Sequence, residues 1–226
     1  MHTGTGQILE VSLADGQPVL RLSCPPNLMP APGQYLLAGR YASDSPLPVP
    51  LFHTESSAES CLVAPAEPVT WLPGERLQLR GPLGNGFTLP AGARRVALIS
   101  FERSMLIVRG LISPALKQGA AVVAVTDGTH DDLPDAVEVQ PLAALDEILA
   151  WADFAAFDVA LAGLTQWRER LGALKQTLAG TEAQIFIRMP VPCGGIAECG
   201  VCAVNIRSGW RLGCKDGPVF ALRDLL

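Results

Sequence analysis

Four of the chain's six cysteines lie near its C-terminal end and have the chemistry of metal ligands. They are Cys193, Cys199, Cys202 and Cys214, with the spacing C-x5-C-x2-C-x11-C. Three thiolates on one short loop and a fourth from a following turn can hold a compact metal centre. Gly194, Gly195 and Gly200 let the loop curl at no steric cost, so that backbone N–H groups can point at cluster sulfurs. The plant-type iron–sulfur spacing, C-x4-C-x2-C with a distant cysteine, differs by one residue in its first interval. We therefore expect a 2Fe–2S cluster.

Two other uses of these cysteines remain open. Structural zinc sites usually contain two C-x2-C pairs, and here only Cys199 and Cys202 form one. Two disulfides would require an oxidising compartment and usually occur in a small secreted chain. We expect the remaining cysteines, Cys24 and Cys61, to be ordinary buried thiols. Within the loop, Cys199 and Cys202 are expected to be harder to replace than Cys193, which lies beyond the two glycines.

The rest of the chain predicts two larger units in front of the cysteine-rich segment. Residues 1–92 contain short alternating stretches, dense prolines and the turn Ala14–Gly16, which is typical of an antiparallel barrel. Residues 93–188 alternate apolar runs such as Arg95–Ser100 with helical stretches, which indicates a small doubly wound parallel α/β domain. Residues 189–226 form the third unit, the cluster module. Prolines between 46 and 73 are expected to lie between strands.

Two motifs give the chain a specific resemblance. Cys214 opens the sequence Cys-Lys-Asp-Gly-Pro-Val-Phe, and Gly81–Phe87 reads Gly-Pro-Leu-Gly-Asn-Gly-Phe. With the cysteine loop, these motifs resemble the electron-transfer subunit of dihydroorotate dehydrogenase (the PyrK family). The resemblance implies a six-stranded flavin-type barrel of the ferredoxin-reductase superfamily, an NAD-domain-like α/β domain and a C-terminal 2Fe–2S module. In that family, electrons pass from NADH to FAD, through the cluster, to a flavin in a separate catalytic subunit.

The nucleotide motifs of the family are altered in this sequence. A glycine-rich turn normally follows the first α/β strand and admits a pyrophosphate, but Ser100–Ser104 contains no glycine and its Glu102 would repel phosphate. We therefore do not expect NAD to bind. In the barrel, Val49 and Phe52 stand where the resemblance implies a phosphate-binding arginine and a flavin-contacting serine. Pro50 and His53 are the candidate FAD contacts that remain, and FAD stays an open case.

Composition limits the possible functions. A net charge of −5 argues against nucleic acid as a partner, and no apolar run reaches the length of a membrane span. The chain begins without a visible signal peptide, so we expect a cytoplasmic protein with reduced thiols. No nucleophile–base pair or carboxylate dyad is evident. We expect an oxidoreductase component without a catalytic site of its own, which relays electrons to or from a partner flavoprotein similar to dihydroorotate dehydrogenase. The alternative is a non-redox docking subunit whose four cysteines bind a structural metal.

Overall fold

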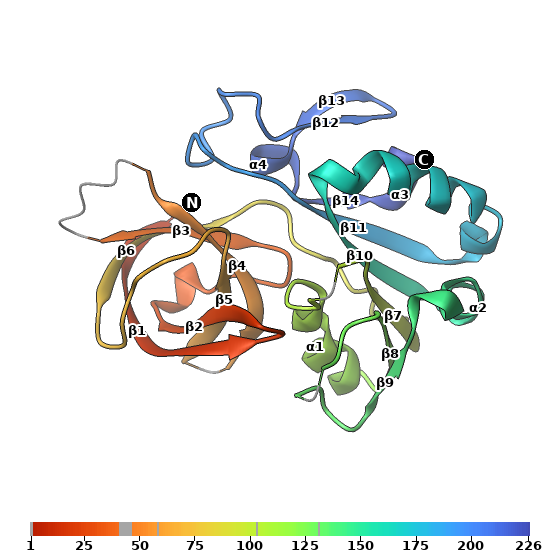
Figure 1. Ribbon diagram of the computed structural model, residues 1–226, viewed down its shortest axis with the longest axis horizontal. Helices are drawn as coiled ribbons and strands as arrows, with labels where there is room; N and C mark the ends of the chain where they lie inside the picture. The colour runs from red at the N-terminus through yellow and green to blue at the C-terminus, as the bar shows by residue number, and fades with distance from the viewer. Residues whose placement is uncertain (1, 41–46, 58, 103, 131) are drawn as a thin grey trace.

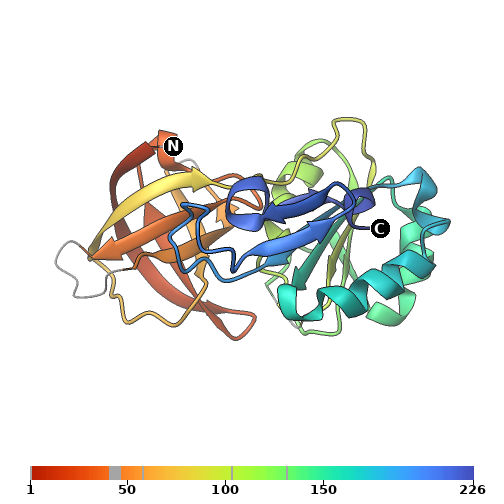
Figure 2. The same cartoon turned by 90° about the horizontal axis from the view of Figure 1, so that it is seen from above.

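The computed structural model of the chain describes residues 2–40, 47–57, 59–102, 104–130 and 132–226. Pro46 of the proline-rich stretch and Arg103 of the altered nucleotide turn lie outside these ranges. A barrel and a mixed sheet lie beside each other (Figure 1), and the C-terminal segment runs over the junction between them (Figure 2). In the described part of the chain, no helix combines the length and apolar character needed to cross a membrane.

The N-terminal part confirms the expected six-stranded antiparallel barrel. Its strands are β1 (His2–Ala14), β2 (Gln17–Ser23), β3 (Tyr35–Arg40), β4 (Val49–Ser56), β5 (Ser60–Pro65) and β6 (Arg76–Leu83). They close in the order β1-β2-β5-β4-β3-β6. In β6 buried and exposed side chains alternate: Leu77 and Leu79 are buried in the barrel, and Gln78 between them is exposed. The short 3-10 helix η1 (Pro26–Leu28) places Leu28 in the same core.

Strand β4 differs from the expectation that the proline-rich stretch lies between strands. Pro50 sits inside β4, paired with Leu37 of β3, and Pro65 ends β5 opposite Leu51. Proline lacks an N–H donor but keeps its carbonyl acceptor. The Pro50 carbonyl uses that capacity by accepting a hydrogen bond of 2.8 Å from the Ala66 N–H.

The second part confirms a largely parallel sheet. Its strands are β7 (Arg95–Ser100), β8 (Ala121–Val125), β9 (Val137–Gln140), β10 (Phe154–Ala160), β11 (Glu182–Arg188) and β14 (Val219–Ala221). The order is β14-β11-β10-β7-β8-β9, with only β14 antiparallel to its neighbour. Strand β7 is apolar on both faces, because Ala97 and Ile99 pack on one side and Val96 and Leu98 on the other. This double burial explains a run without alternation.

Helices cover both faces of this sheet. They are η2 (Val108–Leu111), α1 (Ile112–Lys117), η3 (Leu142–Ala144), α2 (Leu145–Trp151), η4 (Leu161–Gly163), α3 (Leu164–Ala173) and η5 (Thr177–Gly180). Helix α1 packs on one face through Ile112, whereas α2 and α3 pack on the other through Leu145 and Leu171. After β7 the first helical turn is η2, and the segment before it packs against the barrel through Leu106.

The C-terminal segment is joined to the sheet. After the cysteine loop come the hairpin β12 (Ala203–Ile206) and β13 (Gly209–Leu212), the turn of helix α4 (Gly213–Asp216), strand β14 and helix α5 (Leu222–Leu225). Strand β14 pairs with β11 at one edge of the sheet. The hairpin and β9 were not expected from the sequence, and the division at residues 92 and 188 remains a prediction.

Candidate metal centre

The four cysteines come from the two expected segments and form two contacting thiol pairs. The Cys199 thiol donates a hydrogen bond to the Cys193 sulfur, and the Cys214 thiol donates one to the Cys202 sulfur. All four are free thiols. In the described residues, no group of three or more His, Cys, Asp or Glu side chains is arranged to hold a metal ion. The four thiols are therefore arranged as two pairs, Cys193 with Cys199 and Cys202 with Cys214.

The loop turns its backbone N–H groups toward these sulfurs. Gly194, Gly195, Ala197 and Gly200 all have positive φ, between 60° and 74°. Backbone N–H groups of residues 197 to 199 hydrogen-bond to the Cys193 sulfur, and the Ala197 N–H also reaches Cys214. Ala197 pays for its left-handed conformation with steric strain, which the neighbouring hydrogen bonds offset. The expected inward amides are present in the loop.

The cysteine thiols differ in pKa because their surroundings differ. Burial raises the pKa of Cys193, but hydrogen bonds from Cys199 and the loop N–H groups lower it to about 6. Burial and the adjacent Cys202 sulfur raise the pKa of Cys214 to about 12. Cys202 and Cys214 are buried, whereas Cys199 is exposed and Cys193 lies half-buried. One thiol pair thus faces the protein interior and the other lies nearer to solvent.

Residues of the barrel contact both cysteine segments. The hydroxyl of Tyr35, on β3, donates a hydrogen bond of 3.1 Å to the carbonyl oxygen of Cys214. A β-carbon at Gly195 would lie 3.1 Å from the same hydroxyl, so the loop also rests on Tyr35. Arg80, on β6, donates a hydrogen bond to the carbonyl of Gly194. Tyr35 and Arg80 belong to no sequence motif, and only folding brings them to the cysteines.

The two motifs that carry the resemblance meet in space. The turn at Gly84 and Asn85 lies against the Asp216–Pro218 stretch that follows Cys214. The Asn85 N–H donates to the Gly217 carbonyl at 2.5 Å, and its side-chain amide donates to the Asp216 carbonyl at 2.7 Å. A β-carbon at Gly84 would lie 2.5 Å from Cδ of Pro218, so only glycine permits this approach. The barrel motif therefore positions the turn that carries the fourth cysteine.

The candidate flavin contacts, Pro50 and His53, both lie on β4. Pro50 is buried within the strand. The His53 ring packs against Gly110 of η2, with Nε2 2.8 Å from the Ser56 hydroxyl and with Nδ1 unpartnered. Burial lowers the pKa of His53 to about 4, so the ring is neutral near pH 7.

A cluster of aromatic side chains packs between the barrel and the sheet. The centroid of the Phe52 ring lies 5.7 Å from that of Tyr35 and 5.4 Å from that of Phe186 of β11. Phe87 continues the cluster, 6.5 Å from Phe186. Phe52 stands at the position where the resemblance implied a flavin-contacting serine, and its ring belongs to the core between barrel and sheet.

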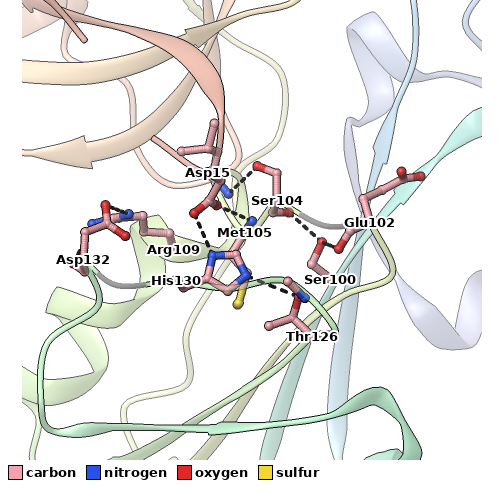
Figure 3. A network of polar contacts seen from close by, with 11 residues as sticks. Asp15, Ser100, Glu102, Ser104, Met105, Arg109, Thr126, His130 and Asp132 are labelled. Carbon is pink, nitrogen blue, oxygen red and sulfur yellow. Dashed lines mark hydrogen bonds and ion pairs between the residues drawn. The ribbon is translucent and has the colours of Figure 1, made fainter. Parts of the chain in front are cut away.

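The carboxyl ends of the parallel strands carry a separate polar network (Figure 3). Ser100, at the end of β7, donates to the Ser104 carbonyl at 2.6 Å. On the neighbouring strand β10, Asp158 is buried and pairs with Arg188 at 2.9 Å. Burial raises the pKa of Asp158 to about 6, although Arg188 opposes the shift. Glu102 lies 3.7 Å from the same arginine.

The two cysteines outside the loop lie in the barrel. Cys61 is buried and Cys24 half-buried, and their thiols hydrogen-bond to each other. Neither takes part in the C-terminal group of four. Cys61, in β5, is the buried thiol that was expected, whereas Cys24, just after β2, is only half-buried.

Comparison with proteins of known function supports the resemblance inferred from the motifs. No family model matches the chain. The chain is similar to the electron transfer subunit of dihydroorotate dehydrogenase B (NAD(+)) from Geobacillus sp. (strain WCH70). The two sequences are 27% identical over 237 residues, covering 88% of each chain. The chain therefore resembles this electron-transfer subunit along most of its length.

Solved structures show the same fold at low sequence identity. An NADH-dependent reduced ferredoxin–NADP oxidoreductase matches with a TM-score of 0.74 at 14% identity, covering 98% of this chain and 89% of that one. Phthalate dioxygenase reductase matches with a TM-score of 0.53 at 12% identity, covering 81% and 68%. These similarities confirm a ferredoxin-reductase-like barrel and sheet.

Proposed function

We propose that this chain is an electron-transfer subunit that holds a 2Fe–2S cluster on Cys193, Cys199, Cys202 and Cys214. The carrying observation is the arrangement of free thiols in two contacting pairs. A binuclear cluster takes two thiolates on each iron, whereas a single zinc ion takes its ligands around one point. The donor set therefore fits the cluster better than the alternative of a structural metal.

The surrounding residues have distinct roles in this proposal. Such a cluster, when bound, supplies one-electron redox chemistry. The loop N–H groups of residues 197 to 199 stabilise negative charge on the sulfurs, and hydrogen bonds of this kind tune iron–sulfur potentials. Tyr35 and Asn85 orient the turn that carries Cys214. Burial of Cys202 and Cys214 keeps water from one side of the site.

The partner is proposed to dock at the exposed edge of the cysteine loop. Cys199 is exposed, and Ile196 and Val201 beside it are 55% and 48% exposed. An apolar rim of this kind suits a protein surface that excludes water on binding. The similarity to a dihydroorotate dehydrogenase electron transfer subunit supports a flavoprotein catalytic subunit as this partner. Six free thiols support a reducing compartment such as the cytoplasm.

The proposed relay contains no step through FAD. The Val49 side chain cannot make the bidentate phosphate contact of an arginine, and Phe52 packs against Tyr35 and Phe186. That Pro50 and His53 contact a flavin remains a prediction. Titration with FAD, followed by its fluorescence quenching in the unsubstituted protein and in a His53→Gln variant, tests it.

Metal and sulfide analysis of anaerobically purified protein tests the cluster. We expect about two irons and two acid-labile sulfides per chain, with an electron paramagnetic resonance signal after reduction. Cys202→Ser should lose both, while Cys24→Ser, a cysteine substitution in the barrel, should keep them. Stoichiometric zinc without sulfide would contradict the cluster and support the docking subunit.

A further inference from the structure

The turn between β1 and β2 carries a carboxylate from the barrel into the α/β part of the chain. Asp15 lies in this turn, with a left-handed φ of 51°, and Gly16 follows with a φ of 71°. Figure 3 shows the Asp15 side chain pointing away from its own hairpin, toward the loop after β7 and the segment after β8. The Asp15 side chain is 2% exposed, so it is enclosed by the part of the protein that it enters.

Both carboxylate oxygens of Asp15 are used there. Oδ2 accepts a hydrogen bond of 2.8 Å from the backbone N–H of Met105, in the loop after β7. Oδ1 lies 2.6 Å from Nδ1 of His130, whose side chain is 1% exposed. The His130 ring is held from its other side by the Thr126 hydroxyl, 3.3 Å from Nε2. A buried carboxylate is tolerated only when its oxygens are satisfied in this way.

The position of this carboxylate has a functional meaning. In doubly wound folds, the loop after the first parallel strand presents backbone N–H groups to the phosphates of a dinucleotide. Strand β7 is that first strand, and Met105 lies in the loop that follows it. The backbone N–H group of Met105 already donates a hydrogen bond to the carboxylate of Asp15, a side chain of the protein itself.

Apolar packing closes the same loop. Leu106, the residue after Met105, is buried against Val19, Leu62 and Ala64 of the barrel. Met105 itself is fully buried. The loop is thus held to the barrel by an apolar contact next to the polar one, which leaves it unsuited to receive a phosphate group.

We propose that Asp15 is a built-in anion that occupies the phosphate position of the dinucleotide-binding edge and fastens the barrel to the α/β sheet. The residues at this edge do not fit NAD, and the barrel turn fills the place where its phosphates would lie. No cysteine takes part, so the inference holds whether or not the chain carries a cluster. If the proposed function also holds, electrons reach this chain from a protein partner and not from a bound dinucleotide.

Chemical rescue of Asp15→Gly tests the proposal. Glycine keeps the left-handed turn and removes the carboxymethyl group that acetate can replace. We expect the melting temperature to fall by about 5–10 °C, because His130 and the Met105 N–H lose their buried partner. Sodium acetate should then raise the melting temperature of Asp15→Gly in a dose-dependent way, with no such rise for the unsubstituted protein. Sodium chloride at equal ionic strength controls for salt.

Two further variants keep the test decisive. Asp15→Asn retains an acceptor for Met105 and tolerates the left-handed turn, so we expect it to fold and to show no acetate rescue. Asp132→Gly removes an exposed carboxylate that pairs with Arg109, and acetate should not rescue it either. An equal response to acetate in Asp15→Gly and Asp132→Gly would overturn the internal anion.

Equilibrium dialysis against NADH tests exclusion of the dinucleotide directly. We expect no saturable binding to the unsubstituted protein at millimolar NADH. Saturable binding would overturn the proposal, whatever the iron content of the sample. Iron and sulfide analysis of the same preparation reports separately on the proposed cluster, so failure of one conclusion is distinguishable from failure of the other.

Discussion

The side-chain amide of Asn85 donates a hydrogen bond of 2.7 Å to the backbone carbonyl of Asp216, 131 residues away in the sequence. Asp216 ends the short helix α4 that also carries Cys214. The carboxylate of Asp216 accepts in turn from the Leu212 N–H at 2.9 Å, which closes the turn on itself. A loop of the barrel thus holds the segment that presents the fourth cysteine.

Replacing Asn85 with alanine should loosen this segment. The loss of one side-chain hydrogen bond to a backbone carbonyl is expected to lower the free energy of unfolding by about 1 kcal/mol. We also expect a reconstituted cluster to bleach faster in air, because Cys214 is less firmly placed. Urea denaturation and the decay of visible absorption measure the two effects. Asn205→Ala, at an exposed position of β12, is the matched control, and equal bleaching rates in the two variants would refute the role of Asn85.

The sequence predicted the parts of the site that lie in local patterns. The cysteine spacing and the glycines predicted a tightly turned cysteine loop, and alternation predicted the barrel. Asn85 belonged to a recognised motif, yet its partner in the Asp216–Pro218 stretch was not evident, because long-range contacts leave no local pattern. Proline density was misleading at Pro50, which lies inside β4 and accepts a hydrogen bond through its carbonyl although it has no N–H to donate.

Tyr35 illustrates what sequence patterns do not contain. Its ring looks like an ordinary core aromatic on β3, and its contact with Cys214 spans 179 residues. Burial raises the pKa of its hydroxyl, and the nearby Cys214 and Cys202 raise it further, so the group stays protonated as a donor. The hydroxyl can donate to the Cys214 carbonyl only because the C-terminal segment packs over the barrel.

Tyr35→Phe removes that hydroxyl and leaves the ring. We expect the free energy of unfolding to fall by about 1 kcal/mol, and by more if the Cys214 carbonyl finds no other donor. The reduction potential of the reconstituted centre should shift as well, because the Cys214 backbone moves relative to the loop. Redox titration followed by visible absorption measures the shift. Identical potentials and stabilities in the two proteins would show that Tyr35 only fills space.

The ranking of the cysteines changes once burial is known. Sequence spacing paired Cys199 with Cys202 as the ligands hardest to replace, but Cys199 is exposed while Cys202 is 1% exposed. We now expect Cys202→Ser to abolish the cluster. Cys199→Ser should keep a labile one, because water and a serine oxygen can approach at the exposed edge, although oxygen is a poorer ligand than thiolate.

Electron paramagnetic resonance of the reduced variants tests this order. Iron content per chain gives a second measure that does not depend on spin state. A normal signal in Cys202→Ser together with an empty Cys199→Ser protein would reverse the ranking. Cys61→Ser serves as the control for replacing a buried cysteine outside the site.

Two buried groups should give the chain opposing responses to acid. Burial lowers the pKa of His53 from its ordinary 6.5 to about 4, so the unfolded chain binds a proton there before the folded one does. The stability from His53 is therefore present above pH 6.5 and is lost as the pH falls toward 4. Burial raises the pKa of Asp158 from 3.8 to about 6, so its contribution is present below pH 3.8 and is lost as the pH rises toward 6.

Single substitutions should separate these two contributions. Each shift corresponds to roughly 3 kcal/mol, so the unsubstituted protein should show little change in unfolding free energy between about pH 4.5 and pH 6. Without the histidine, His53→Gln should become less stable as the pH rises through this window, because only Asp158 responds. Asp158→Asn should become more stable over the same window, because only His53 responds. Urea denaturation at several pH values gives the slopes, and slopes of the same sign in the two variants would refute the assignment.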